Sequence, residues 1–297
     1  MKKCRKLTAL VLILALAFSL AGCGSPTARM AIAAKKMQKL QSYRMDMDMD
    51  MEMKLSVLGQ DMDMDMKVTG STDVNTKPNR TKSEMNLELL GEQMKVLSYT
   101  ETTDTGLVSY SSPDGGKTWT RTSLESEELA NAAGKSSFTD LMKLAATFEQ
   151  TGTETVRGSE ATVFSGMIQS GDVEKVMQMS SLLEDVLETM NMSLDEVELE
   201  DLGGIPVTIA LDNKSGLVVR YTMDLTELMA SLMPAMVDAI MAEAASQAGL
   251  EGLDLSALGF KVETGRVFAS GELYDFNAVG TIEIPAEALN APELEAA

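Results

Sequence analysis

The chain has 297 residues, a formal net charge of −20, no histidine and two cysteines. The absence of histidine excludes His-based triads, His general bases and nearly all catalytic zinc sites, so the composition predicts a protein that is not an enzyme and holds no cofactor. The strong negative charge argues against nucleic-acid partners and against adhesion to anionic headgroups through basic patches.

The N-terminus predicts an export signal. A basic n-region (Lys2 to Lys6) precedes an apolar stretch, Leu7 to Leu20, that is too short for an ordinary membrane span. The tetrapeptide that follows resembles the lipobox of bacterial lipoproteins: Leu20, Ala21, Gly22 and Cys23. That resemblance implies a diacylglyceryl group on Cys23 and cleavage just before it.

Processing would remove residues 1–22 with four cations and no anions, so the charge becomes −24 and 275 of 297 residues remain. Cys4 leaves with the signal and Cys23 is acylated, which leaves no thiol for a disulfide or a nucleophile. Two acyl chains give stable membrane attachment, whereas one does not. We therefore expect a protein anchored through the Cys23 lipid on the outer face of the cell membrane.

The body begins with a predicted helix. Residues 23–28 are expected to form a lipidated tether, and Arg29 to Gln41 shows helical spacing of apolar residues. We expect a single α+β domain over residues 29–285 and a flexible C-terminal end over residues 286–297.

From Tyr43 the apolar period changes to two, which predicts antiparallel strands. Methionines alternate with charged residues from Met45 to Val57, and the pattern restarts at Met62. A turn at Gly59-Gln60 would pair residues whose numbers sum to 119, placing Lys54 opposite Asp65. The hairpin recurs 32 residues later, with a turn expected at Gly91-Glu92.

The rest of the chain alternates hairpins with helices. Further strands are predicted over 107–111, 117–122, 153–157, 161–169, 206–212, 217–224, 260–269 and 278–284. Helices are predicted over 125–148, 172–192 and the apolar stretch that includes Leu228 and Leu232. This order predicts an antiparallel, strongly curved sheet, an incomplete β-barrel, with helices packed across its concave face.

The methionine stripe raises the question of function. Unbranched thioether side chains adapt to irregular apolar space, although β-branched residues would suit a strand better. Three interpretations stay open: a filled core, a deformable cavity for an acyl chain, or a copper(I) site. The candidate cavity residues are Met47, Met49, Met51, Met53, Met64, Met66, Met85, Met94, Met233 and Met236.

Two other patterns favour structural roles. The aspartates that alternate with the methionines are too widely spaced along a strand to surround calcium, so a solvated face is expected. The sequence from Ser112 to Trp119 resembles the Asp-box of β-propellers, where the motif is a structural hairpin; here it occurs once. We expect a Gly-rich turn with Trp119 packed back on the strand.

Lipobox, N-terminal helix, long meander and crossing helices together resemble the LolA/LppX/LprG superfamily of lipoprotein and lipid carriers. The methionine hairpins also resemble Met-rich Firmicute lipoproteins of unknown function. The superfamily implies an apolar cavity for acyl chains between sheet and helices. We therefore expect a non-enzymatic, membrane-anchored protein that binds a lipid or another hydrophobic ligand. The alternative is a structural or protein-interaction lipoprotein with a filled core.

Overall fold

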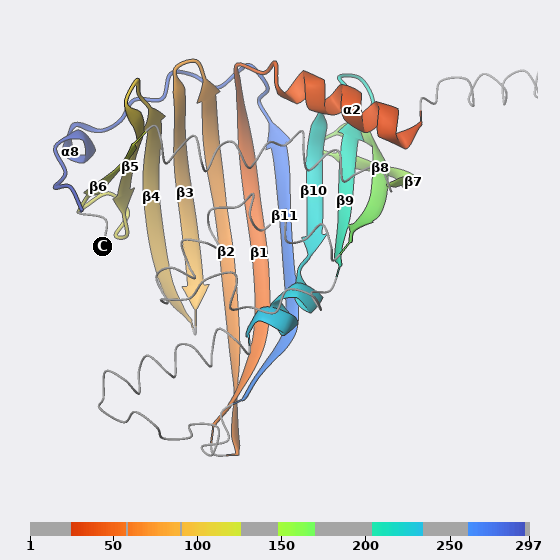
Figure 1. The fold of residues 1–297 in the computed structure, drawn as a ribbon, viewed down its shortest axis with the longest axis horizontal. Coiled ribbons are helices and arrows are strands. Elements are labelled where there is room, and N and C mark those ends of the chain that lie inside the picture. Colours follow the sequence, from red (N-terminus) through yellow and green to blue (C-terminus); the bar gives the residue numbers. More distant parts are fainter. Residues whose placement is uncertain are drawn as a thin grey trace, which may run out of the picture.

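The computed structural model describes residues 25–57, 59–89, 91–125, 148–169, 204–233 and 261–294. Eleven strands in this part of the chain form one curved, unclosed antiparallel sheet in the order β6-β5-β4-β3-β2-β1-β11-β10-β9-β8-β7 (Figure 1). The predicted antiparallel sheet is confirmed. The helices predicted over 125–148 and 172–192 fall almost entirely outside the described residues, as do the signal peptide, Cys23 and Met236.

The sheet consists of two meanders joined by its last strand. The first meander comprises β1 (Ser42–Val57), β2 (Gln60–Thr76), β3 (Asn79–Leu89), β4 (Glu92–Thr102), β5 (Gly106–Ser112) and β6 (Thr120–Glu125). The second comprises β7 (Glu149–Val156), β8 (Ser159–Ile168), β9 (Ile205–Asp212) and β10 (Val218–Asp224). Strand β11 (Lys261–Tyr274) pairs with β1 on one side and β10 on the other.

The N-terminal helix α2 (Pro26–Met37) starts three residues before the predicted position, inside the segment expected to be a tether. Ser25 caps it, because its hydroxyl accepts a hydrogen bond from the Ala28 N–H at 3.2 Å. Pro26 follows at the first turn, where its missing N–H costs nothing. The helix buries Met30, Ala33 and Ala34, as its apolar spacing predicts.

The predicted register of the first hairpin is wrong by two residues. In the structure the paired numbers sum to 117, so Lys54 lies opposite Asp63 and not Asp65. The turn is one residue earlier than predicted: Val57 pairs with Gln60, and Gly59, with φ +78°, is the second central residue. A shift of two leaves every side chain on the same face, so the apolar pattern does not distinguish the two registers.

The second hairpin differs from its prediction in the same way. Leu89 pairs with Glu92, and Gly91, with φ +81°, is again the second central residue of the turn. The two hairpins are therefore repeated in structure as well as in sequence.

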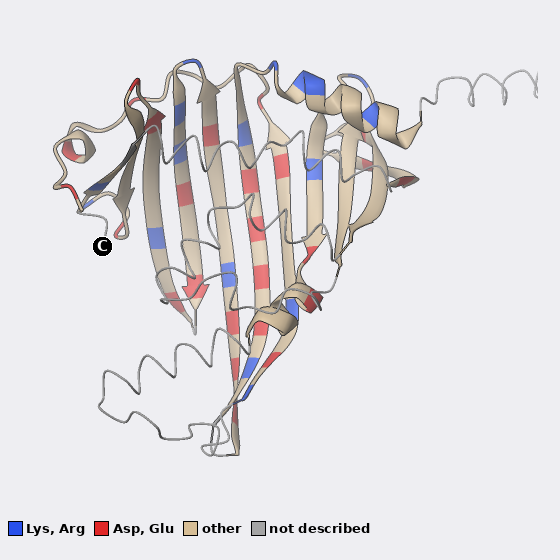
Figure 2. Ribbon diagram, viewed as in Figure 1, with Lys and Arg blue, Asp and Glu red and all other residues tan. Residues whose placement is uncertain are grey.

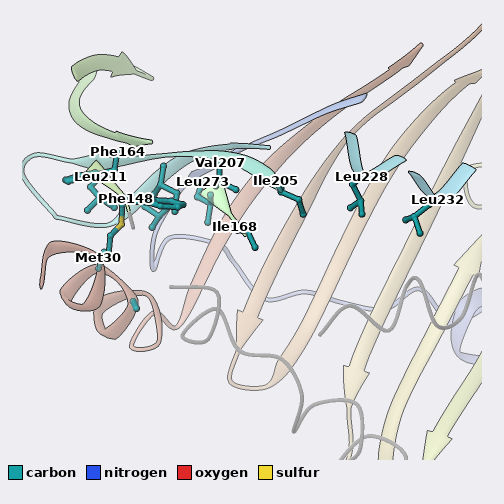
Figure 3. Close-up of a cluster of buried hydrophobic side chains, with 14 residues drawn as sticks. Met30, Phe148, Phe164, Ile168, Ile205, Val207, Leu211, Leu228, Leu232 and Leu273 are labelled. Carbon is teal, nitrogen blue, oxygen red and sulfur yellow. The ribbon is translucent and has the colours of Figure 1, made fainter. Parts of the chain in front are cut away.

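The main core lies where α2 crosses the end of the sheet formed by β8, β9, β10 and β11 (Figure 1, Figure 3). Met30 of α2 points toward Phe148, just before β7, and toward Leu211 of β9 (Figure 3). Residues 226–233 are helical and bury Leu228 and Leu232 in the same cluster, as the sequence predicts. Helices thus cover this part of one face of the sheet.

A second cluster lies at the other end of the sheet, on its opposite face. It contains Tyr99, Val108, Tyr110, Trp119, Ile282 and Ala288. Residues 278–284, predicted as a strand, are not a strand; the segment runs along the sheet end toward α8 (Ala286–Leu289) (Figure 1). Beyond α8, the Leu294 N–H donates to the Arg121 carbonyl at 2.8 Å, so the chain beside β6 is hydrogen-bonded to that strand.

Candidate functional site

One face of the sheet carries the methionine stripe, and we call it the Met face. Met45, Met47, Met49, Met51 and Met53 alternate along β1 and therefore point to the same side. Met45 packs against the core beneath α2, which identifies the Met face as the face that α2 covers at one end.

Apolar side chains continue across the neighbouring strands of the Met face, because directly paired residues share a face. Met53 pairs with Met64, and Met51 with Met66. Three longer rows follow the register across β1 to β4: Met51, Met66, Leu89; Met49, Val68, Leu87, Met94; and Met47, Gly70, Met85, Val96.

Eight of the ten predicted cavity residues therefore lie on one face. Met47, Met49, Met51 and Met53 come from β1, Met64 and Met66 from β2, and Met85 and Met94 from β3 and β4. Met233 is the last described residue of the helical segment 226–233, and Met236 lies outside the described residues.

Burial on the Met face decreases from the middle toward the hairpin tips. Met51 is 7% exposed. Met47, Met49, Met53 and Met64 are half-buried, whereas Met62 and Met94, near the two turns, are 49% and 48% exposed. The face thus offers partly accessible apolar surface beside a fully buried core.

Two glycines flank Met47 across the sheet, and neighbouring side chains fill the space that they leave. A Cβ on Gly271 would lie 2.4 Å from the ring of Tyr221, and a Cβ on Gly70 would lie 2.7 Å from the Glu84 carbonyl oxygen and 3.0 Å from Met85 Cγ. Tyr221 also donates its hydroxyl to the Met45 sulfur at 3.7 Å. Sequence reasoning missed Gly70, Gly271 and Tyr221. The strand pairing places the two glycines on either side of Met47.

In the described strands β1 to β4, the Met face carries one charged side chain, Glu92, which pairs with Leu89 beside the β3–β4 turn, and the face becomes polar toward the α2 end of β2 to β4. There Thr72 and Ser83 are hydrogen-bonded at 2.9 Å, and Thr81 and Thr100 at 2.5 Å. Burial raises the pKa of Tyr43, close to the core. An occupant of the middle of this face would meet thioethers, aliphatic groups and hydroxyls; the one charged side chain of the described strands β1 to β4 on this face, Glu92, lies at the hairpin tip.

The opposite face carries the alternating charges of β1 and β2, as the sequence predicts (Figure 2). The ammonium group of Lys67 lies 3.7 Å from Asp48 and 3.4 Å from Asp50, and these carboxylates raise its pKa. Arg157 contacts Asp46, lies 3.0 Å from Glu272 and stacks on a tyrosine ring. No three carboxylates of the described residues converge where they could hold a metal ion.

Several hollows open on the charged side of the sheet. One of about 600 Å³ is lined by charged residues, with Met51, Met66 and Gly91 also in its lining: Asp50, Glu52, Asp63, Asp65, Lys67, Glu88 and Arg266. Another of about 470 Å³ is lined by Lys67, Thr69, Asn86 and Lys95, among others. Their linings are dominated by charged and polar groups, so they do not resemble apolar ligand sites.

The Asp-box-like segment is a structural turn, and Trp119 packs as predicted. The Asp114 carboxylate accepts hydrogen bonds from the Thr118 N–H at 2.9 Å and the Thr118 hydroxyl at 2.7 Å. The Trp119 indole N–H donates to the Gly116 carbonyl at 3.1 Å, and its ring centroid lies 5.8 Å from that of Tyr99. The turn connects β5 to β6 and anchors the second core.

Comparison with known proteins gives a family and distant structural likenesses. The model of a family of unknown function, DUF6612, matches residues 30–230. The lipoprotein LppX of Mycobacterium tuberculosis is similar at 12% identity and a TM-score of 0.44, over 86% of this chain and 97% of that one. LprF from Mycobacterium bovis is similar at 11% identity and a TM-score of 0.42, over 89% of this chain and 100% of that one.

No curated protein sequence matches the chain. Both TM-scores are below 0.5, so neither likeness indicates what this chain does. Within the described part of the chain, no helix has the length and apolar character needed to span a membrane.

Proposed function

This chain belongs to DUF6612, a family of unknown function, and we propose a role for it that is inferred from its own residues. It would be a non-enzymatic, lipid-anchored binding protein for an acyl chain or a similar apolar ligand. The anchor would be the lipid on Cys23, on the outer face of the cell membrane. The ligand would lie against the Met face.

The observation that carries the proposal is the partly exposed apolar surface across β1 to β4, where Glu92 beside the β3–β4 turn is the single charged side chain among the described residues. A structural core would favour well-packed β-branched side chains on such strands. Here the central positions are unbranched thioethers that adjust to an occupant of variable shape. Their half-burial contrasts with the fully buried aliphatic and aromatic residues under α2.

The N-terminal anchor supports the same role. The folded body begins at the Ser25 cap, so only Gly24 separates it from Cys23. One intervening residue spans only about 7 Å from Cα to Cα when extended. A binding face held so near the bilayer surface suits extraction or presentation of lipid at that membrane.

Ligand binding can be tested with a charge on the Met face. Met49→Glu places a carboxylate in the middle of the apolar rows, where desolvation opposes an apolar ligand. We expect roughly tenfold or greater weakening of binding to a fluorescent fatty acid, because a 1.4 kcal/mol loss already gives tenfold. The matched control is Asn86→Glu, which adds the same charge at an exposed position of the charged face.

Native mass spectrometry of gently purified protein gives a second readout. The proposal predicts co-purifying lipid in the unmodified chain and in Asn86→Glu, and less in Met49→Glu. Absence of lipid, together with no uptake of the fluorescent fatty acid by any variant, would instead favour a structural lipoprotein with a filled core. Circular dichroism of each variant checks that the sheet is retained.

A further inference from the structure

The N-terminal helix is a local exception to the acidic character of the chain. The described residues from Ser25 to Met45 contain no aspartate or glutamate. They contain five cations, of which four precede β1: Arg29, Lys35, Lys36 and Lys39, with Arg44 inside the strand. The described structure therefore begins with a basic segment, although the net charge of the whole chain is −20.

The geometry of α2 separates these cations into two groups. Arg29 turns inward, donates to the Thr162 hydroxyl at 3.1 Å and lies over the Phe164 ring at 4.9 Å. Lys36 donates to the Ser215 carbonyl. In contrast, the side chains of Lys35 and Lys39 are exposed and have no ion pair within the described part of the chain.

An exposed isoleucine lies on the same outward side of the segment. Ile32 is 55% exposed, although α2 has an inner face that buries Met30, Ala33 and Ala34. Ile32 and Lys35 of α2, and Lys39 in the turn that follows it, are spaced by three and four residues, which places them on one outward side of the segment. We call these three residues the outer stripe. An exposed apolar residue beside lysines is a feature of helices that lie in a membrane interface.

The turns at the same end of the sheet add to this basic character. The β2–β3 and β9–β10 turns lie at the end where α2 lies (Figure 1), and they contain the exposed residues Lys77 and Lys214. Two carboxylates at that end, Asp73 and Asp275, share an ion pair with Arg44. The other carboxylates of β1 and β2 lie farther along the strands, toward the hairpin tip.

We propose that the outer stripe, on α2 and the turn after it, rests on the anionic membrane surface into which the Cys23 lipid inserts. The inference rests on the proposed function for the anchor, since Cys23 precedes the Ser25 cap by two residues. Clusters of lysine are attracted to anionic lipid headgroups, and a nearby lipid chain provides the second binding signal. The composition argued against any basic membrane patch, but charge acts locally because salt screens it beyond about 8–10 Å.

This arrangement gives the molecule a defined orientation. The α2 end faces the bilayer, and the long β1–β2 hairpin extends away from it (Figure 1). The acidic strands are thereby kept away from the anionic headgroups. Because the inner side of α2 covers one end of the Met face, that end of the binding surface is the one closest to the lipid.

Vesicle binding of the non-acylated mature chain tests the contact without the anchor. Residues 23–297 carrying Cys23→Ser should sediment with phosphatidylglycerol-containing vesicles and not with phosphatidylcholine alone. Lys35→Gln with Lys39→Gln should weaken this binding roughly thirtyfold, given the usual contribution of each lysine at an anionic surface. Lys54→Gln with Lys117→Gln, two exposed lysines remote from α2, should leave it unchanged. Equal effects of the two pairs, or no effect of either, would overturn the proposal.

A depth measurement on the acylated full chain gives an independent test. Since Cys23 is acylated, Ile32→Cys supplies the one thiol available for a fluorescent label in the mature chain. In anionic vesicles we expect quenching of this label by brominated lipid, and none for a label at Glu92→Cys on the β3–β4 turn. Equal accessibility of both labels to an aqueous quencher contradicts the proposal. Binding of the fluorescent fatty acid is measured in a separate assay. Loss of the contact between the outer stripe and the membrane is thereby distinguished from failure of ligand binding.

Discussion

At the scale of single residues, Asp114 shows how one carboxylate holds a turn. It accepts hydrogen bonds from the Thr118 N–H, the Thr118 hydroxyl, the Ser112 hydroxyl and the Lys117 N–H. The bonds from Thr118, followed by the one from Ser112, lower the pKa of Asp114 well below the ordinary range. The ionised form is therefore the one that the fold stabilises.

We predict that Asp114→Asn lowers the free energy of unfolding at pH 7. A depressed folded pKa contributes stability above the unfolded pKa of about 3.9, and this contribution is lost as the pH falls through the folded value. The difference between the unmodified chain and Asp114→Asn should therefore shrink below about pH 4. Urea unfolding at several pH values measures it. Asp104→Asn, in the exposed β4–β5 turn, is the control and should show no such difference.

At the scale of elements, the two methionine hairpins show how glycine position sets register. Gly59 and Gly91 both adopt positive φ at the second central position of a two-residue turn. That places Lys67 opposite Asp50, where their side chains come within 3.4 Å. The apolar and charged faces are identical in the registers two residues apart, so the ion pairs and the turn decide between them.

Cross-linking can distinguish the two registers. Lys54→Cys with Asp63→Cys should form a disulfide readily, because directly opposite residues have Cβ atoms about 4.5–5.5 Å apart. Lys54→Cys with Asp65→Cys tests the register inferred from the pattern, and it should cross-link slowly because those positions are diagonal neighbours. Non-reducing electrophoresis of an internally cleaved chain reports the bond. A faster reaction of the second pair would contradict the register described here.

At the scale of the whole molecule, the segment after β11 connects distant parts of the sheet. The Arg80 guanidinium donates to the Ile282 carbonyl at 3.2 Å, and the Arg121 N–H donates to the Pro292 carbonyl at 3.0 Å. Ile282 is buried in the cluster that contains Trp119. The end of the chain therefore completes the core of the β4–β6 end, more than a hundred residues away in sequence.

We predict that Ile282→Ala destabilises the protein by about 2–5 kcal/mol, the usual cost of truncating a buried isoleucine. Trp119 is the single tryptophan, so its fluorescence reports on this cluster directly. Its emission should shift to longer wavelength and its quenching by iodide should increase. Leu289→Ala, at a 49% exposed position of α8, should change neither. An unchanged Trp119 spectrum in Ile282→Ala would contradict the packing described here.

The sequence predicted most strands and the helix α2, because period-two and helical apolar spacing are local signals. It placed Met47, Met49, Met51 and Met53 on one strand face for the same reason. It did not predict that β11 inserts between β1 and β10, or that residues 278–284 leave the sheet, because strand order depends on contacts between segments far apart in the chain.

The sequence by itself determined the alternation that separates the Met face from the charged face, since side-chain direction along a strand follows from the backbone alone. Only the tertiary structure decided the register, the extension of the methionine rows across β1 to β4, and the exposure of Ile32 and Lys35 on α2 and of Lys39 just after it. Which side of α2 is covered depends on the strands that meet beneath it. That packing turns a short basic stretch in an acidic chain into a surface that can face a membrane.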